Sequence, residues 1–252
     1  MALRIETFSN SKGGNSLYKA LSHPWTAERA RHLISGVAAA GPVAVYDPHD
    51  CLEALAEFYD LSHWDVRHVF VQRIEALGQQ RRGRAVQPVT ELRSARVKTL
   101  FVAAFDAERL VGQIRHLVPA GVAVSTLDDA RLPDDMLTRP RQYLNPLNFA
   151  TNFVFFRDAG GLHTRLGSCN YWHGYGAADP ALWLCLFDEH GKVLAQWRET
   201  LPAGAATFRI DSAEVRRRFD LPAFTGSLFL HAQRVAGHDT VKYALDTYAD
   251  AT

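Results

Sequence analysis

The spacing of apolar residues changes between about Asp129 and Leu147, where three prolines interrupt a stretch with little periodicity. Before this stretch, apolar strand-like runs alternate with amphipathic helical segments, which is typical of a parallel sheet covered by helices. After it, short apolar runs alternate with turn residues. Proline-rich, non-periodic segments are where domain boundaries fall. The sequence therefore predicts two domains, an α/β domain over residues 1–135 and a β domain over residues 145–252.

The first domain contains one well-marked strand, helix and strand. Residues 98–104 form an apolar run, Asp106 is placed to cap the following helix, and Gly121 ends that helix before the apolar residues 122–124. A strand, helix and strand in this order make a right-handed parallel crossover close to obligatory. Further strands are expected at residues 43–46, 68–71 and, weakly marked, 83–89.

The order of these elements from Pro42 to Arg131 resembles the small Rossmann-like domain of sugar-modifying acyltransferases and of some methyltransferase accessory domains. The likeness is one of topology and includes no diagnostic motif. It implies a degenerate Rossmann-like α/β domain, and it implies no particular activity because a fold does not carry a function.

The second domain reads as all-β. Seven short strands separated by turn signals are expected at residues 152–156, 162–166, 181–187, 192–197, 207–210, 227–232 and 241–248, with one short helix at 213–219. Strands of this number and spacing predict a β-sandwich. The runs Thr164-Arg165-Leu166, Leu186 to Ala195 and Gly226 to Phe229, together with Asn170, are similar to bacterial immunoglobulin-like sandwich domains. That resemblance implies a binding or structural module.

The charge balance and the cysteines narrow the classes of partner and compartment. The 252 residues are 47% hydrophobic and carry a formal charge of +1, so nothing electrostatic favours nucleic acid or an acidic membrane as a partner. Cys51, Cys169 and Cys185 are too few and too scattered for a disulfide framework or a four-thiolate zinc site. With no secretory signal and no apolar run of membrane-spanning length, we expect a cytoplasmic protein.

The turn after the first strand argues against a dinucleotide cofactor. It reads Asp47-Pro48-His49-Asp50, where a glycine turn would let a pyrophosphate approach the backbone. Two interpretations stay open: the acidic turn only caps a helix, or Asp47, His49 and Asp50 face a small polar ligand together with Arg73 and Asp106. The basic residues from Arg73 to Lys98 are interpreted as a solvated loop face, with anion binding by a few of the arginines as the alternative. The segment Ser9–Ser16 has its lysine before its glycines, so we expect a flexible loop there and not a phosphate-binding one.

Residues 162–176 form the most unusual segment of the chain. Aromatic, amide, thiol and imidazole groups are crowded there beside glycines, and aromatic planes flanked by hydrogen-bonding groups suit sugar rings and other amphipathic ligands. The candidate ligand-binding residues are Asn170, Tyr171, Trp172, His173 and Tyr175. In the opposing interpretation, Trp172 fills the core with Trp183 and Trp197 while His173 and Tyr175 lie on a loop.

Catalysis remains the alternative to binding. Candidate acid–base or nucleophilic groups are His163, Cys169, His173 and Asp47, in a site between the two domains that acts on a small polar metabolite or sugar derivative. The histidines of the second domain match no standard metal spacing, so no metal and no cofactor is predicted. The sequence favours a binding protein for a small polar or carbohydrate-like ligand or for a partner protein, and it leaves the oligomeric state open.

Overall fold

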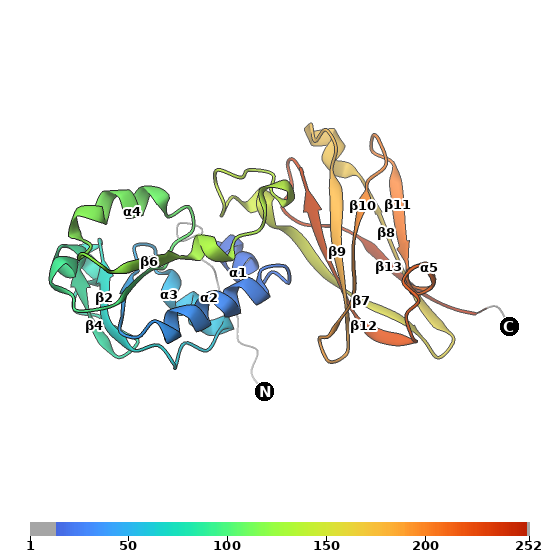
Figure 1. Cartoon of the computed structure of the whole chain (residues 1–252). Coiled ribbons are helices and arrows are strands. Elements are labelled where there is room, and N and C mark those ends of the chain that lie inside the picture. Colours follow the sequence, from blue (N-terminus) through green and yellow to red (C-terminus); the bar gives the residue numbers. More distant parts are fainter. Residues whose placement is uncertain (1–13, 251–252) are drawn as a thin grey trace. The chain divides into compact units, whose positions relative to one another are not determined.

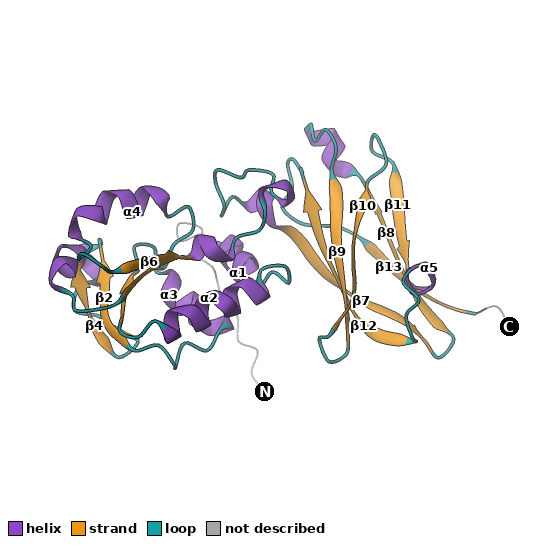
Figure 2. Ribbon diagram, in the orientation of Figure 1, coloured by secondary structure: helices purple, strands orange, loops and turns teal. Residues whose placement is uncertain are grey.

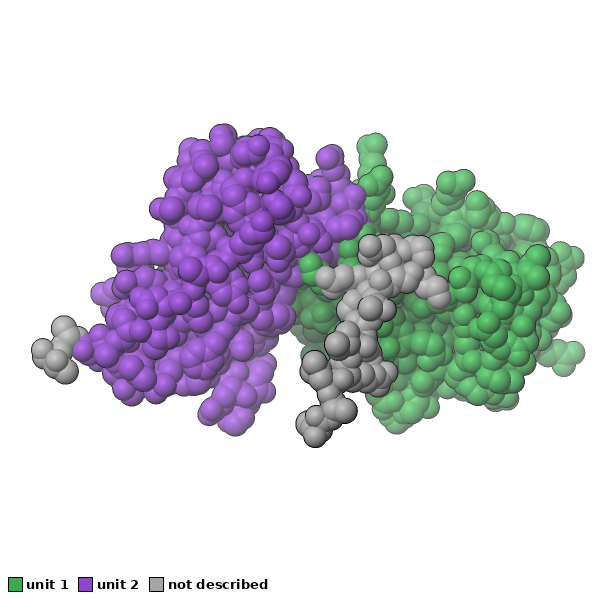
Figure 3. Space-filling view, turned by 180° about the vertical axis from the view of Figure 1, so that it is seen from behind, with its two compact units in different colours: residues 1–132, 141–144 green, residues 133–140, 145–252 purple. Residues whose placement is uncertain are grey.

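A computed structural model describes residues 14–250 of the chain, which divide into two compact units (Figure 3). The first unit comprises Met1–Leu132 and Arg141–Leu144, and the second comprises Pro133–Pro140 and Asn145–Thr252. Residues 9–13 of the segment Ser9–Ser16, expected to be a loop, lie outside the described residues, and residues 14–16 are not a loop because the helix α1 (Gly14–Leu21) begins there. No helix within residues 14–250 has the length and apolar character that a membrane span requires.

The first unit is built on a mostly parallel six-stranded sheet. Its strands are β1 (Val43–Tyr46), β2 (Val66–Val71), β3 (Gln80–Arg81), β4 (Arg84–Pro88), β5 (Thr99–Val102) and β6 (Ala123–Thr126). The spatial order is β3-β4-β2-β1-β5-β6, and only the β3–β4 pair is antiparallel. From β1 the chain therefore moves outward to β2 and the β3–β4 hairpin on one side, and it then continues with β5 and β6 on the other side of β1.

Helices flank this sheet, as Figure 1 shows, with α4 on one face and α2 and α3 on the other. The α-helices are α1 (Gly14–Leu21), α2 (Ala27–Ala39), α3 (Cys51–Phe58) and α4 (Glu108–Ile114), and the short 3₁₀ helices are η2 (Ile74–Ala76), η3 (Val89–Ser94), η4 (Arg115–Leu117) and η5 (Leu127–Ala130). Every residue of β1 and of β5 is buried, because helices cover both faces of a parallel sheet. This explains why both strands read as continuous apolar runs.

One capping prediction for this unit is wrong. Asp106 does not cap α4, because its backbone is left-handed (φ +52°) and its side chain contacts other groups. The backbone N–H groups of Asp106 and Ala107 instead donate to the carboxylate of Asp128, at 2.8 Å each. A carboxylate from η5, which follows β6, thus binds the two backbone amides just before α4.

The second unit holds an antiparallel sheet, and each of the seven expected strands is present (Figure 2). The strands are β7 (Ala150–Ala159), β8 (Leu162–Cys169), β9 (Ala181–Asp188), β10 (Val193–Thr200), β11 (Thr207–Asp211), β12 (Phe224–Gln233) and β13 (Ala244–Ala249). The helical segments are α5 (Ser212–Arg218), η6 (Asp134–Met136), η7 (Pro146–Phe149) and η8 (Tyr171–Tyr175). The strand order is β10-β9-β12-β7-β8-β11, and β13 pairs with β8.

The core of this unit lies between two groups of its strands. Pairing of β7 with β8 is confined to Asp158↔His163 and Ala159↔Leu162, so the two strands separate after their hairpin. One buried cluster combines Leu184 of β9 and Leu228 of β12 with Leu166 of β8 and Ile210 of β11. In β8 the buried residues alternate with more exposed ones, whereas most of β9 and the second half of β12 are buried at every residue. Burial of one face of β8 fixes the register in which it pairs.

Candidate functional site

The five candidate ligand-binding residues follow β8 directly, and the structure separates them into two groups. Asn170 and Trp172 are buried: the Asn170 side-chain amide donates to the Pro202 carbonyl at 2.9 Å, and the Trp172 indole N–H donates to the His238 carbonyl at 3.1 Å. Tyr171 is half-buried, whereas His173 and Tyr175 are exposed. Asn170 and Trp172 therefore hold the loop in place, and the exposed residues are available to a ligand.

Tyr171 and Tyr175 belong to the wall of an open groove of about 670 Å³. The remaining lining comes from the end of β8, the start of β11 and the segment that leads into β13. The lining residues are Gly167, Ser168, Cys169, Tyr171, Tyr175, Thr207, Phe208, His238, Lys242, Tyr243 and Ala244. His173 is not among them.

Two small residues that pair across neighbouring strands form the floor of the groove, so no large side chain fills it there. Gly167 of β8 pairs with Ala244 of β13. Successive strand residues point to opposite faces, so Gly167 lies on the face opposite the buried Leu166. A Cβ atom placed on Gly167 would meet no other atom within 4 Å, which means that the space above this position is open.

Aromatic side chains form the walls, and hydrogen bonds fix their rings. The Tyr171 hydroxyl donates to the Thr240 carbonyl at 2.5 Å and accepts from the Lys242 backbone N–H at 3.0 Å. Burial raises the pKa of Tyr171 to about 12, so its hydroxyl stays protonated at neutral pH. The Tyr243 hydroxyl donates to the Phe153 carbonyl at 2.8 Å. These bonds leave the wall little freedom to collapse into the groove.

Tyr175 is the most exposed aromatic residue of the lining, with 56% of its surface accessible. Its ring stands edge-on to the His238 ring at 4.7 Å between centroids, and its hydroxyl lies 3.0 Å from His238 Nε2. Gly237 makes this position possible, because a Cβ there would lie 2.4 Å from Tyr175 Cγ and its φ is +74°. Gly237 is therefore a positioning residue for Tyr175.

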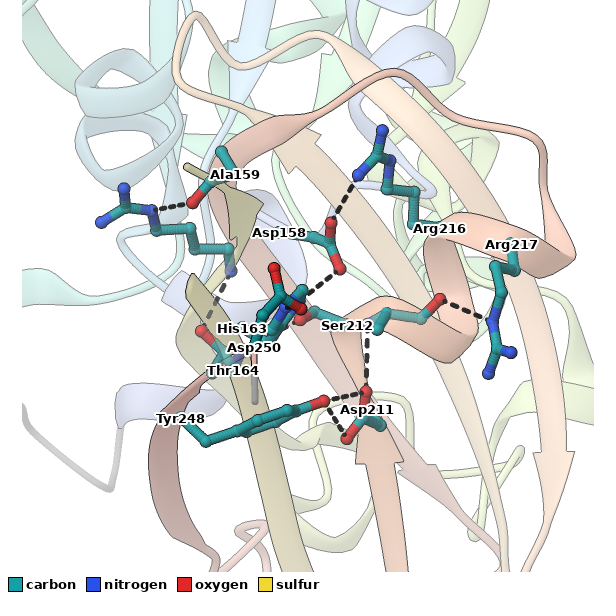
Figure 4. A network of polar contacts seen from close by, with 12 residues as sticks. Asp158, Ala159, His163, Thr164, Asp211, Ser212, Arg216, Arg217, Tyr248 and Asp250 are labelled. Atoms are coloured by element: carbon teal, nitrogen blue, oxygen red, sulfur yellow. Dashed lines mark hydrogen bonds and ion pairs between the residues drawn. The ribbon is translucent and has the colours of Figure 1, made fainter. Parts of the chain in front are cut away.

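His163, a catalytic candidate, lies in a polar network at the other end of β8 (Figure 4). Its Nδ1 is 2.9 Å from Asp158 and its Nε2 is 2.8 Å from Asp250, so carboxylates hold both ring nitrogens. Asp158 also pairs with Arg216 at 2.9 Å. Hydrogen bonds to Asp158 and then to Asp250 raise the pKa of His163 above its usual value. Both ring nitrogens are thus already engaged within the protein.

The same network fastens β13 to its neighbours. The Tyr248 hydroxyl lies 2.8 Å from both carboxylate oxygens of Asp211, and Arg165 Nε is 2.9 Å from that carboxylate. The Arg165 guanidinium also covers the Tyr248 ring at 4.4 Å. Burial alone would raise the pKa of Asp211, but the hydrogen bonds from Tyr248 and Arg165 hold it below its usual value.

The catalytic candidates of the second unit do not assemble. His163 and Cys169 stand at opposite ends of β8, roughly 20 Å apart for an extended chain of that length. Cys169 lines the groove without His173, and no hydrogen bond joins these two residues in the described part of the chain. The three cysteines are free thiols. Within residues 14–250, no group of three or more His, Cys, Asp or Glu side chains is arranged to hold a metal ion.

Asp47, the catalytic candidate of the first unit, is neutralised inside the protein. Its side chain is fully buried at the end of β1, accepts from the Cys51 N–H at 2.7 Å and pairs with Arg81 at 2.7 Å. Arg81 also pairs with Asp50, which contacts Arg73 at 2.6 Å. Burial raises the pKa of Asp47 to about 6, against the opposing effects of Cys51 and Arg81.

This arrangement corrects the interpretation of the basic stretch. The Arg81 side chain is only 10% exposed and is not part of a solvated face. The acidic turn does more than cap α3, because its two carboxylates bind a buried guanidinium. Nothing in residues 73–96 signals that Arg81 differs from its neighbours, since the partner carboxylates are distant in sequence.

No protein-family model matches the chain, and no curated protein sequence matches it either.

Proposed function

We propose that this protein binds a carbohydrate in the groove at the end of β8. In this proposal the second unit is an immunoglobulin-like β-sandwich that presents the binding site. The first unit is a degenerate Rossmann-like domain that does not bind a dinucleotide. We also place the protein in the cytoplasm, in line with its three free thiols.

The observation that supports this proposal is the exposed ring of Tyr175 beside a floor of small residues. A sugar ring has an apolar face that packs on an aromatic side chain and a polar edge that needs hydrogen bonds. The groove offers Tyr175 and Tyr171 for the faces, and Thr207 and His238 for the edges. Its volume of about 670 Å³ lies within the range of small-molecule sites.

The floor provides a variant that fills the groove without removing any contact. Gly167→Leu places a side chain into the open space above the floor, so we expect it to abolish sugar binding while the melting temperature stays nearly unchanged. Gly36→Leu is the matched control, because a Cβ at Gly36 also meets nothing within 4 Å and the residue lies on α2.

A second pair of variants tests the aromatic wall. Tyr175→Ala removes an exposed lining residue, and we expect at least a tenfold loss of affinity with a stability change within about 0.5 kcal/mol. His173→Ala, an exposed neighbour outside the lining, should bind as the wild type does. A glycan array identifies ligands, and calorimetry measures the affinities. If Gly167→Leu and Tyr175→Ala both bind every wild-type sugar ligand normally, the groove is not the site.

A further inference from the structure

The described lining of the groove contains a positively charged side chain and no negatively charged one. Of the described residues that line it, Lys242 is the only permanently charged one, and no aspartate or glutamate belongs to the lining. A neutral ligand does not need a cation in its binding site. A cationic ligand is repelled by a lysine and binds better beside a carboxylate. The lining therefore favours a ligand of negative charge.

Lys242 is exposed, and its ammonium has no carboxylate partner in the described part of the chain. Its Nζ lies 5.3 Å from the centroid of the Tyr171 ring, a contact that orients the side chain without neutralising it. Five arginines elsewhere in the same unit are each paired with a carboxylate, namely Arg165, Arg198, Arg209, Arg216 and Arg218.

The segment that carries Lys242 is also fixed. Its backbone N–H donates to the Tyr171 hydroxyl at 3.0 Å, and its carbonyl accepts from the Ser168 hydroxyl at 2.6 Å. The two bonds attach this segment to both the floor strand and the aromatic wall. The ammonium is thus held at the groove on a backbone that does not need to reorganise when a ligand arrives.

We infer that the ligand of the groove is an anionic sugar, one that carries a carboxylate, sulfate or phosphate group. The anionic group pairs with the Lys242 ammonium while the sugar ring packs on Tyr171 and Tyr175. A lysine ammonium is a compact point charge that binds any of these oxyanions, so the shared chemistry is the negative charge. This inference rests on the proposed function and narrows its ligand class.

The test compares sugars that differ only in charge. Calorimetry with trigalacturonate and its methyl ester isolates the carboxylate, and a sulfated or phosphorylated oligosaccharide beside its unmodified parent isolates the other two groups. We expect the wild type to bind the charged member of at least one pair at least tenfold more tightly. This preference should weaken as NaCl rises from 0.05 to about 0.5 M, because salt screens an exposed ion pair.

Three lysine variants assign the preference to one side chain. Lys242→Met keeps the length of the side chain and removes the charge, so the charged and neutral sugars should bind it equally and about as the wild type binds the neutral one. Lys242→Arg should retain the preference. Lys192→Met, at an exposed lysine in the turn between β9 and β10, should not change it.

The outcomes distinguish failure of the inferred anionic ligand from failure of the proposed sugar binding. If the wild type binds both members of every pair equally, or if Lys242→Met keeps the preference for charge, the inference is overturned and sugar binding stands. If the wild type binds no member of any pair and no sugar on the array, the proposed function falls and the inference falls with it.

Discussion

Removal of the Arg81 side chain should strongly destabilise the first unit. The Asp47 side chain has no exposed surface and that of Arg81 has only 10%, so their ion pair is shielded from water. Arg81→Met keeps much of the apolar volume and leaves Asp47 with backbone amides as its only hydrogen-bond donors. Loss of one partner of a buried ion pair costs about 3–5 kcal/mol. We expect the lower end, about 3 kcal/mol, because Asp47 with its pKa of about 6 escapes part of the penalty by taking up a proton.

The assay is thermal unfolding of the full chain by calorimetry. A loss of about 3 kcal/mol should lower the melting temperature of the first unit by roughly 6–12 °C. Adding Asp47→Asn should restore most of it, since an amide needs no cation and still accepts from the Cys51 N–H. The deficit should also narrow as the pH falls toward about 6 and stay constant below that. In the variant the folded-state pKa of Asp47 lies above the wild-type value of about 6, so protonation stabilises the variant in a range where the wild-type carboxyl is still ionised, whereas below about pH 6 both proteins gain stability equally.

The control is Arg73→Met, whose side chain is 38% exposed and pairs with Asp50. An ion pair this accessible contributes about 1 kcal/mol or less. If Arg81→Met lowers the melting temperature no more than Arg73→Met does, or if Asp47→Asn brings no recovery, the argument from burial is refuted.

Three further predictions concern other parts of the chain. Since its carboxylate partners raise the pKa of His163, the charged ring contributes stability that is fully present below about pH 6.5 and is lost as pH rises through the folded-state pKa. The gap in melting temperature between the wild type and His163→Gln should therefore be widest near pH 5.5 and smallest near pH 8.5; a gap that does not vary with pH would count against this. Trp172→Ala should cost about 3–5 kcal/mol, as expected for a fully buried tryptophan, and a loss below about 1 kcal/mol in urea unfolding would show that the loop does not depend on it. NAD, FAD and S-adenosylmethionine should give no heat on calorimetric titration, because carboxylates already occupy the strand ends where a cofactor phosphate would bind; low-micromolar binding of any of the three would contradict this.

Local pattern sufficed to predict the strands. The continuous apolar runs at residues 43–46 and 181–187 each reflect burial of the strand on both faces. These features repeat within a few residues, so the sequence displays them directly.

The side-chain partnerships were not predictable in this way. Asp128 binds the backbone amides of Asp106 and Ala107 at the approach to α4, and Arg81 binds Asp47, in each case across a long stretch of chain. The groove shows the same limit. Tyr171 and Tyr175 are visible in an unusual segment, but Lys242 joins them only because β13 pairs with β8, and no local signal marks it.

The pairing of Gly167 with Ala244 has a consequence for the order in which the molecule becomes competent to bind. Contacts between residues this far apart in sequence form slowly, because the ends of the long intervening stretch of chain must come together before the contacts stabilise anything. A partly refolded chain that already has β8 and η8 still lacks Lys242, Tyr243 and half of the floor. Affinity for the ligand should therefore return with the last strand and not before it. Ligand present during refolding would stabilise only the completed sheet, and the recovery of binding would be a direct kinetic probe of that final step.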